Sequence, residues 1–586
     1  MANCESILHL HNQRVSKNLK RCTGTLIFPA NVLFFGDCRE SASIDEYFKR
    51  LSDEDECRSV NLRIPSTIKT LSSFKAITVA YNMLNGSLPN GLCELTNLSE
   101  LDLSENMFDG NLPNCLNRLS YLETLDISSN QFTGMLPASL IANLTSLMYI
   151  DFSLNKFEGS FSFSSLCNHT KLEFFQLKRD NEKLEVETEK PIGWIPMFQC
   201  KVLALPNWNI KRLKGSVVPS FLLHQHKLQV LDMPHNSLEG QFPNWLLKNN
   251  TKLKYLNLRN NSLQGVMHME YLNANMRFLD MSGNHITGII HHDIQKFISY
   301  VEYLNFSSNA LNGVIPSSIC DLHQLQILDL SQNNFSGRLP NGFVTNLSHL
   351  GMLKLSKNAL HGQILSGNLS LGGIDVLHLD NNYFTGNIGN NIVEHNDRLI
   401  SMDISDNFFR GTIPSWISNA TGIVELVMRN NRFEGQIPCG KASFSYLDIS
   451  HNFFSGPIPY CLNLEQMQFL HLSYNRFTGL VPNNLSGRIP EFLVMLSGKL
   501  PEWKAQFVTF TEESYEGNPL LFGPPLENNC ITKSPVTHPS NEEGTNKKWY
   551  SVDMASFYGS SCSTWLVFIL GLQRFFTSIL TGVEGG

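Results

Sequence analysis

The sequence of 586 residues predicts an α/β-type solenoid, a right-handed superhelix of about 17 short repeats with a parallel β-strip on its concave face. The pattern LxxLxLxxNxLxG returns about every 24 residues, and many copies are followed by Ile-Pro or a variant of it. The asparagine of the pattern keeps its place through most of the chain. A unit this short cannot bury its own leucines, so neighbouring repeats must stack into one core.

Each part of the repeat has a structural reason. In LxxLxLxxN two apolar residues alternate with polar ones, as in Leu328-Asp329-Leu330, which predicts a short strand with buried leucines. The asparagine turns the chain, and its buried amide is expected to bond backbone groups of neighbouring turns. Glycine supplies the next bend, and Ile-Pro begins the outer segment. The asparagine position, a structural ladder, holds Asn82, Asn106, Asn130, Asn155, Asn236, Asn261, Asn284, Asn309, Asn333, Asn358, Asn382, Asn407, Asn431, Asn452 and Asn475.

Two repeats without this asparagine fill the gap from Asn155 to Asn236. LEFFQLKRD places Asp180 at the asparagine position, and VLALPNW places Trp208 there. The 28-residue steps on either side of Trp208 indicate loop insertions, the first within KLEVETEKPIGWIP. The 21-residue step to Asn452 indicates a deletion, because CGKASFSYLDIS has lost most of its outer segment.

The chain divides into five regions. Residues 1–63 are a divergent segment with no clear signal peptide and a degenerate cap, and residues 64–482 form the repeat array. Residues 483–530 hold partial repeats and a remnant of a C-terminal cap, and residues 531–561 read as a polar juxtamembrane stalk. Residues 562–586 contain the degenerate transmembrane-like stretch 565–580, which Gln573-Arg574 interrupts. An arginine in mid-span costs about 2.5–3.5 kcal/mol on insertion scales.

Composition and motifs exclude several classes of protein. The net charge is −7 and no basic block is present, which argues against nucleic-acid binding. The sequence has no Gly-x-Ser-x-Gly, no P-loop, no His-Glu-x-x-His and no kinase lysine-and-aspartate set, so no catalytic residue and no cofactor is predicted. No metal site is predicted either, because His291-His292-Asp293 are only three adjacent residues on a loop.

Glycosylation sequons favour a secreted or cell-surface protein. Twelve Asn-x-Ser/Thr acceptors are present: Asn85, Asn97, Asn143, Asn168, Asn249, Asn260, Asn305, Asn334, Asn346, Asn368, Asn419 and Asn484. Cys93 with Cys115, and Cys439 with Cys461, fall on the outer segments of adjacent repeats. Each pair either staples its two repeats or remains as buried thiols.

LxGxIP is the plant-type variant of the leucine-rich repeat, and residues 64–562 resemble plant receptor-like proteins. The stretches that carry the resemblance are KLEVETE, VLALPN, PSFLLHQHKLQVLDM, LPEWKAQF, YEGNPLLFGPPL and SVDMASFY. The resemblance implies a single-span receptor at the plasma membrane with its glycosylated repeat domain outside. It also implies a short cytoplasmic tail without a kinase, and signalling through a leucine-rich-repeat receptor kinase as partner.

The sequence departs from the family at four places. A signal peptide and a cysteine-paired N-terminal cap are not legible before residue 64, where Cys38 and Cys57 are candidates for remnants of the cap. Repeats and a non-repeat island are missing between residues 482 and 496. In the cap motif Phe522 replaces a cysteine, which leaves Cys530 without its expected partner, and the apolar stretch 565–580 is interrupted. These departures put signalling competence in doubt.

Three sets of strand residues are candidates for the concave surface. A column of aspartates from Asp102 to Asp448 is read as a repeat-consensus feature satisfied by neighbouring serines. Tyr255, Phe278 and Tyr303 lie two residues before that column on three consecutive repeats. They form either a ligand-binding ridge, flanked by Arg259 and by Asn305 if it is unglycosylated, or a stack that covers the strands. Residues that break the columns are specificity candidates: Lys178, Arg179, Arg259, Lys354, Lys357, His378, Arg429 and His471. Lys354, Lys357 and His378 suit a peptide carboxylate.

We therefore expect a plant cell-surface receptor-like protein that binds an extracellular peptide or protein ligand, in defence or development. One alternative is a secreted, apoplastic interaction protein, either a decoy or an inhibitor of an extracellular enzyme. The other alternative is a degenerate paralogue without activity.

Overall fold

The computed structural model describes residues 25–27, 63–178, 183–189, 191, 193–208, 218–343, 346–366, 373–389, 398–442, 444–459, 467–478, 497–499 and 520–522. The chain divides into two units, residues 1–529 and 530–586, and all described residues lie in the first. Asp180, Arg179, Cys461 and the stretch 565–580 lie outside the described residues. Among the described residues no helix is both long and apolar enough to cross a membrane.

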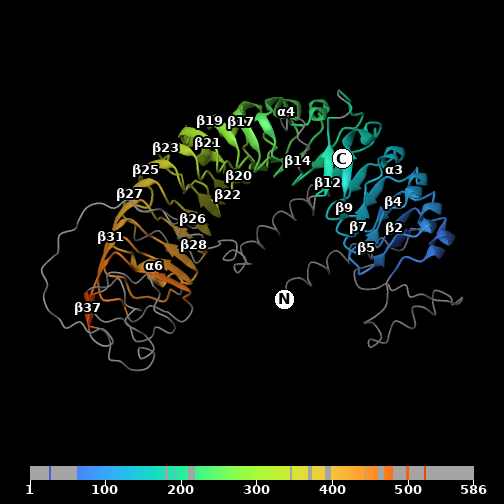
Figure 1. Ribbon diagram of the computed structural model, residues 1–586. Helices are drawn as coiled ribbons and strands as arrows, with labels where there is room; N and C mark the ends of the chain where they lie inside the picture. Colours follow the sequence, from blue (N-terminus) through green and yellow to red (C-terminus); the bar gives the residue numbers. More distant parts are fainter. Residues whose placement is uncertain are drawn as a thin grey trace, which may run out of the picture. The chain divides into compact units, whose positions relative to one another are not determined.

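A parallel sheet of three-residue strands runs through the array in sequence order (Figure 1). It has 18 described strands, of which β1 (Thr25–Ile27) pairs with β2, and the other 17 supply one strand per repeat, as predicted. These are β2 (Ala76–Thr78), β4 (Glu100–Asp102), β6 (Thr124–Asp126), β8 (Tyr149–Asp151), β11 (Phe174–Gln176), β13 (Val202–Ala204), β14 (Val230–Asp232), β16 (Tyr255–Asn257), β18 (Phe278–Asp280), β20 (Tyr303–Asn305), β22 (Ile327–Asp329), β24 (Met352–Lys354), β26 (Val376–His378), β28 (Ser401–Asp403), β30 (Glu425–Val427), β32 (Tyr446–Asp448) and β34 (Phe469–His471).

Each residue of a main-sheet strand pairs with its counterpart in the next repeat. Leu328 pairs with Leu304 on one side and with Leu353 on the other, and all three are fully buried. The first and third residues of each strand face away from this leucine core, because side chains alternate along a strand. We call the surface that they form the strand face.

The asparagine ladder confirms the predicted turn. Asn333 accepts a hydrogen bond from the Leu311 N–H (3.0 Å) and donates to the Phe306 carbonyl (2.9 Å) of the preceding repeat. It also donates to two carbonyls of its own turn at 3.1–3.2 Å. Trp208 takes this position in its repeat, as predicted. Its indole N–H donates to the Leu177 carbonyl, and its backbone N–H donates to Asn236 Oδ1 (2.6 Å).

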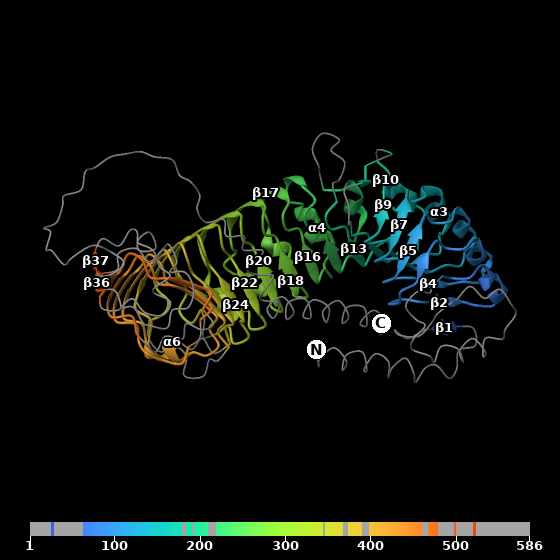
Figure 2. The ribbon, with the colours of Figure 1, turned by 60° about the horizontal axis from the view of Figure 1, so that its bottom comes forward.

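A second set of strands follows the ladder, and the sequence analysis did not predict it. These strands are β3 (Asn85–Gly86), β5 (Met107–Gly110), β7 (Gln131–Gly134), β9 (Lys156–Phe157), β15 (Glu239–Gln241), β17 (Ser262–Val266), β19 (His285–Ile289), β21 (Ala310–Val314), β23 (Asn334–Arg338), β25 (Ala359–Gln363), β27 (Tyr383–Gly386), β29 (Phe408–Gly411), β31 (Arg432–Gly435), β33 (Phe453–Gly456) and β35 (Arg476–Phe477). They form parallel rows of four and eleven strands, and Figure 2 shows β17 on the side of the array away from β16 and β18. The phenylalanines of this segment form a buried stack, in which the ring centroids of Phe409 and Phe433 lie 6.3 Å apart.

Short helices complete the outer segments, most of them beginning directly after a proline. They are η1 (Ser66–Leu71), η2 (Asn90–Glu94), η3 (Asn114–Arg118), α3 (Ala138–Asn143), η4 (Phe163–Leu166), η5 (Ser220–His224), α4 (Asn244–Asn249), η6 (Met269–Tyr271), α5 (Ile294–Phe297), η7 (Ser317–Asp321) and α6 (Ser415–Asn419). Proline fixes φ and lacks an N–H, which suits it to this position. The remaining strands are β10 (Gly159–Ser162), β12 (Leu184–Glu187), β36 (Ser497–Lys499) and β37 (Leu520–Phe522).

The predicted insertion and deletion both have structural counterparts. The insertion forms β12, which pairs with β10, and Trp194 packs behind it with its indole N–H on the Thr188 carbonyl (2.7 Å). The shortened repeat leaves an apolar cavity of about 20 Å³ between neighbouring outer segments, lined by residues that include Ile417, Leu426 and Ala442. A repeat that loses part of its outer segment cannot fill the space its neighbours leave, because the strands keep their spacing.

The predicted staple between Cys93 and Cys115 is a disulfide, and it joins η2 to η3. Cys439 is also disulfide-bonded, while Cys167, Cys200 and Cys320 are free thiols.

Candidate functional site

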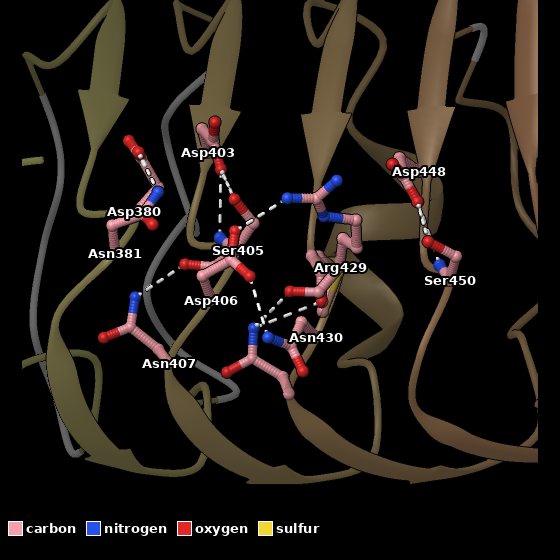
Figure 3. Close-up of polar contacts among 12 residues, drawn as sticks. Asp380, Asn381, Asp403, Ser405, Asp406, Asn407, Arg429, Asn430, Asp448 and Ser450 are labelled. Atoms are coloured by element: carbon pink, nitrogen blue, oxygen red, sulfur yellow. Dashed lines mark hydrogen bonds and ion pairs between the residues drawn. The ribbon is translucent and has the colours of Figure 1, made fainter. Parts of the chain in front are cut away.

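The aspartate column of the strand face is built from a local motif, as predicted. In Asp403-Ile404-Ser405 the carboxylate Oδ1 accepts hydrogen bonds from the Ser405 N–H (2.9 Å) and hydroxyl (2.7 Å). The same pair of bonds joins Asp448 to Ser450, and Figure 3 shows both pairs, with the repeat of Arg429 between them. Asp102, Asp126, Asp280 and Asp329 repeat the motif with their own serines. One carboxylate oxygen of each is therefore occupied within its own turn.

The second carboxylate oxygen is bonded from the next repeat at several positions. The Tyr149 hydroxyl donates to Asp126 (3.3 Å), and the Tyr303 hydroxyl donates to Asp280 (3.1 Å). Asp232 has no serine in its own turn, and its Oδ1 accepts a hydrogen bond from the Asn257 amide of the next repeat (2.8 Å). These bonds join successive repeats, so the stacking of the array explains the regular aspartate column without a ligand.

Burial and mutual repulsion shift the titration of this column. Burial, and after it the neighbouring carboxylate of Asp126, raise the pKa of Asp151 to about 7. Asp403 also reaches a pKa of about 7 through burial and the nearby Asp380, and burial raises the pKa of Asp232 to about 6. These carboxyl groups therefore take up protons near neutral pH.

The three predicted aromatic residues form one continuous stack, but most of it is not exposed. Ring centroids lie 4.2 Å apart for Tyr255 and Phe278 and 4.1 Å apart for Phe278 and Tyr303. Tyr255 is only 4% exposed and Phe278 only 7%, while Tyr303 is half-buried. The expected exposed ridge is therefore wrong for Tyr255 and Phe278, because rings on adjacent strands at this spacing cover one another's faces. The other alternative, a stack that covers the strands, describes these two residues.

Arg259 lies at the edge of the aromatic stack and is exposed. Its Nε and one terminal nitrogen lie 3.3 and 3.1 Å from Nε2 of His235, which orients the guanidinium across the repeat boundary. Both Arg259 and Lys178 lie near enough to Asp232 to lower the pKa of this carboxyl against the effect of burial. In the described residues neither cation has a carboxylate within ion-pair distance. This part of the strand face is basic.

The predicted patch of Lys354, Lys357 and His378 is assembled as expected but differs in charge. Lys354 pairs in register with His378 on the next strand, and Lys357 is exposed at the end of the Lys354 turn. Burial and the nearby Lys354 lower the pKa of His378 to about 3, so the imidazole is neutral. Its Nε2 bonds to the Ser401 hydroxyl (2.9 Å), which donates to Glu425 (2.7 Å). An anionic group would therefore meet the two lysines, while His378 contributes no charge.

The sequence analysis missed the acidic groups next to Arg429. Its guanidinium donates to Asp406 Oδ2 (2.9 Å), and Asn430 donates to the other oxygen of the same carboxylate (2.8 Å; Figure 3). Asp380 stands where most repeats carry the serine, and Asn381 bonds to it at 2.9 Å. These residues break the consensus as Arg429 does, and comparing aspartates that lie outside the regular column would have found them.

A row of left-handed residues was also missed. The residue before each ladder position has a φ between 50° and 68°: Tyr81, Glu105, Ser129, Leu154, Asn207, His235, Asn260, Ser308, Gln332, Lys357, Asn381, Asp406, Asn430, His451 and Tyr474. Non-glycine residues pay about 1–2 kcal/mol for this conformation. The side chains of Lys357, Asp406 and His235 are therefore presented from a fixed, strained turn.

The sequons differ in accessibility. Seven acceptor asparagines are exposed, namely Asn97, Asn143, Asn168, Asn260, Asn334, Asn346 and Asn419. Asn85, Asn249 and Asn305 are half-buried, and Asn368 and Asn484 lie outside the described residues. Asn305 lies on the strand face, where its amide nitrogen is 3.2 Å from the Tyr303 hydroxyl and its Oδ1 accepts the Ser307 N–H (2.9 Å).

One group of metal-ligand type occurs among the described residues. His291, His292 and Asp293 offer donor atoms that all lie within 4.8 Å of one another, on the turn before α5. It lies in an outer segment, away from the strand face, and it has no neighbouring nucleophile.

The leucine-rich-repeat family model matches residues 97–119, 121–143, 227–249, 275–297, 300–322, 324–346, 398–420 and 466–488. These eight stretches are therefore leucine-rich repeats, and the other described repeats share their main-sheet strand. Receptor-like protein 1 of Arabidopsis thaliana is 42% identical over 152 residues, and receptor-like protein 14 is 38% identical over 155 residues. Each alignment covers 26% of this chain, and 14% and 15% of the two relatives respectively.

Solved plant receptor ectodomains share the fold. The ectodomain of the Arabidopsis receptor kinase HAESA, in complex with an extended IDA peptide hormone, matches with a TM-score of 0.62 and 27% identity. That match covers 80% of this chain and 78% of HAESA. The ectodomain of GASSHO1/SCHENGEN3, in complex with CASPARIAN STRIP INTEGRITY FACTOR 2, gives the same TM-score and identity over 80% of this chain and 61% of its own.

Proposed function

We propose that this chain is the ligand-binding repeat domain of a plant cell-surface receptor-like protein, which binds an extracellular peptide or protein on its strand face and signals through a partner receptor kinase. Relatives that are receptor-like proteins and structural neighbours bound to peptide hormones support the proposal. HAESA has also been solved with its peptide and the co-receptor SERK1, which supports a kinase partner. The relatives do not distinguish defence from development.

One observation carries the proposal: where the Asp and Ser columns are interrupted, cations occur that have no carboxylate within ion-pair distance in the described part of the chain. Arg259, Lys354 and Lys357 are these groups on the middle repeats. A carboxylate or another anion on a ligand would pair with them without displacing an existing ion pair, and such charge complementarity governs specificity.

The aromatic stack has a supporting role in this proposal. Tyr303 is its accessible end, and its hydroxyl is already directed at Asp280. Phe278 stacks directly on Tyr303, and Tyr255 stacks on Phe278, so the two buried rings hold Tyr303 in place without themselves meeting a ligand. A ligand that covers Tyr303 would desolvate this aromatic side chain, and truncating such a residue at an interface commonly costs about 2 kcal/mol or more.

The test removes the free cations. The variant Arg259→Ala, Lys354→Ala, Lys357→Ala is compared with Lys171→Ala, Lys248→Ala, Lys252→Ala, a matched set of exposed cations on the outer segments. Each immobilised chain is exposed to plant extracellular fluid, and retained peptides and proteins are quantified by mass spectrometry. We expect a ligand that the parent and the outer-segment variant retain, and that the strand-face variant loses by about tenfold or more. Equal retention by both variants would remove the strand face as the binding surface.

Glycosylation at Asn305 gives an independent test of the role of Tyr303. A glycan there would project from the strand face beside the Tyr303 hydroxyl. We expect little or no occupancy when tryptic glycopeptides of the secreted chain are analysed. Full occupancy would shield Tyr303 and move the proposed contact to Lys354 and Lys357.

Two other functions predict different outcomes. A secreted decoy or enzyme inhibitor would be recovered entirely in the soluble fraction after carbonate extraction, whereas the receptor stays with the membranes. A degenerate paralogue would be revealed by a transcript that differs from the genomic locus around residues 482–496.

A further inference from the structure

Two neighbouring outer turns carry histidine at a position where most repeats carry proline. Three residues after the turn glycine, Gly110, Gly313 and Gly411 are followed by proline. The same position after Gly265 holds His268, and after Gly288 it holds His291. Two residues further on, these turns place Glu270 and Asp293. Stacking of the repeats therefore brings two histidines and two carboxylates side by side.

The contacts confirm that the two turns touch. The His291 N–H lies 3.4 Å from the sulfur of Met269, which is between His268 and Glu270. His268 Nδ1 lies 2.9 Å from Glu270 Oε1. Glu270 holds the position in its turn that Asp293 holds in the next, so stacking of the turns places the two carboxylates on adjacent outer turns.

The second turn adds a third histidine. The rings of His291 and His292 stack with centroids 4.4 Å apart, and His292 Nε2 is 3.6 Å from Asp293 Oδ2. Donor atoms of His291, His292 and Asp293 all lie within 4.8 Å of one another. Three residues on one loop do not make a metal site, but the contacting turn of the preceding repeat carries a further carboxylate, Glu270, and a histidine bonded to it, His268.

We propose that these turns bind a divalent transition-metal ion of the Zn²⁺ class, with His291, His292, Asp293 and Glu270 as ligands and His268 holding the Glu270 carboxylate. Two imidazoles and two carboxylates are a donor set that suits Zn²⁺ and its neighbours. A carboxylate fixed by a second hydrogen-bonded group is the usual outer-shell arrangement of such sites. Because two repeats supply the ligands, the bound ion would cross-link η6 to α5.

Binding requires two existing contacts to open. Lys296 Nζ pairs with Asp293 Oδ2 at 2.9 Å, and the Asp293 N–H donates to His291 Nδ1 at 3.1 Å. The metal ion takes the place of the Lys296 ammonium at the carboxylate and takes the His291 lone pair from the N–H. Protons compete with the metal ion for the imidazole nitrogens, so binding weakens at acid pH.

The experiment is histidine modification by diethyl pyrocarbonate on the full chain without an affinity tag, with and without Zn²⁺ at pH 7.5, read out peptide by peptide. His323, on the outer segment of a nearby repeat and also exposed, is the internal control. We expect Zn²⁺ to slow modification of His291 and His292 about fivefold or more while His323 is unchanged. The site-resolved readout separates these residues from the other histidines and from the free cysteines.

Two variants keep the test independent of folding. Asp293→Asn and Glu270→Gln change exposed groups on the surface turns, and each is expected to reduce the protection of both histidines, as is a drop to about pH 5.5. Asp321→Asn is the matched control, because Asp321 is an exposed carboxylate on η7 near His323. Protection that is absent, that extends equally to His323, or that survives both ligand variants would overturn the proposal.

Discussion

Asn333→Ala tests the structural reasoning most directly. Asn333 is 6% exposed, and its side chain makes four hydrogen bonds to backbone groups. Alanine removes all four and leaves the buried Leu311 N–H without its partner, while the Phe306 carbonyl keeps only its bond from the Asn309 amide (3.1 Å). Both of these residues are 1% exposed. A buried polar group that loses its partner costs about 1–3 kcal/mol, so we expect the free energy of unfolding to fall by about that amount.

The loss should be local to one repeat boundary. Asn309 and Asn358, the adjacent ladder residues, keep their own contacts, including those to the Phe306 and Leu330 carbonyls that each of them shares with Asn333. In an array whose repeats contact only their neighbours, a single weakened boundary opens before the rest. Hydrogen exchange of peptides that cover Leu311 should therefore speed up in the variant, while exchange at a distant boundary such as that of Asn106 should not.

The assay is urea unfolding followed by far-ultraviolet circular dichroism, combined with hydrogen exchange by mass spectrometry. Asn275→Ala is the matched control, because Asn275 is exposed and lies outside both the ladder and the sequons. If Asn333→Ala unfolds at the same urea concentration as Asn275→Ala, and the Leu311 amide exchanges at the parent rate, the asparagine ladder does not hold the repeats together.

Three further predictions concern the interior and the aspartate column. His169 is fully buried and neither ring nitrogen has a hydrogen-bond partner among the described residues, so His169→Leu should stabilise the chain by about 1–3 kcal/mol in urea unfolding. Gln225→Leu, at the corresponding position of a later repeat, should instead destabilise it, because that amide bonds the Cys200 N–H and the Phe198 carbonyl. Ala442→Val fills the apolar cavity beside the shortened repeat and should raise the melting temperature, with a gain of up to about 1 kcal/mol; a fall in melting temperature would show that the cavity wall is rigid. Because the pKa of Asp151 is raised, the folded chain binds more protons than the unfolded chain between about pH 4 and pH 7. The contribution of Asp151 to stability therefore falls as the pH rises through that range, and Asp151→Asn should gain stability relative to the parent over the same range. A difference in unfolding free energy between variant and parent that stays constant with pH would contradict the shift.

Much of the architecture follows from the sequence because the repeat fixes its own register. Once Leu328 and Leu330 are assigned to the buried face, Asp329 between them must face outward, and Ser331 lies within reach of its carboxylate. The ladder is predictable for the same reason, even where Trp208 replaces asparagine. All these contacts involve residues within one repeat or at equivalent positions of adjacent repeats, so a single alignment of the repeats predicts them.

The features that the sequence did not predict arise from contacts between adjacent repeats. The second row of strands forms only when successive turns bond through their backbones, as Gly313 and Phe335 pair in register, and no side-chain alternation marks it clearly. The burial of Tyr255 follows from the ring that happens to lie on the next strand. The neutral charge of His378 follows from burial and from Lys354, a full repeat away. Composition at one position does not contain this information.

The hydrogen bonds that hold the repeats together also bear on where a ligand would bind. A carboxylate such as Asp403, whose oxygen already accepts two hydrogen bonds from its own turn, gains little by meeting a ligand, because a new bond replaces an existing one. A cation such as Arg259 or Lys354, which has no carboxylate within ion-pair distance among the described residues, can pair with a ligand anion without giving up an ion pair. The consensus positions hold the repeats together, so specificity must come from the departures from the consensus. Lys354 and Arg259 are therefore stronger candidates for the proposed ligand contacts than the aspartate column, and their replacement is the decisive test of the strand face.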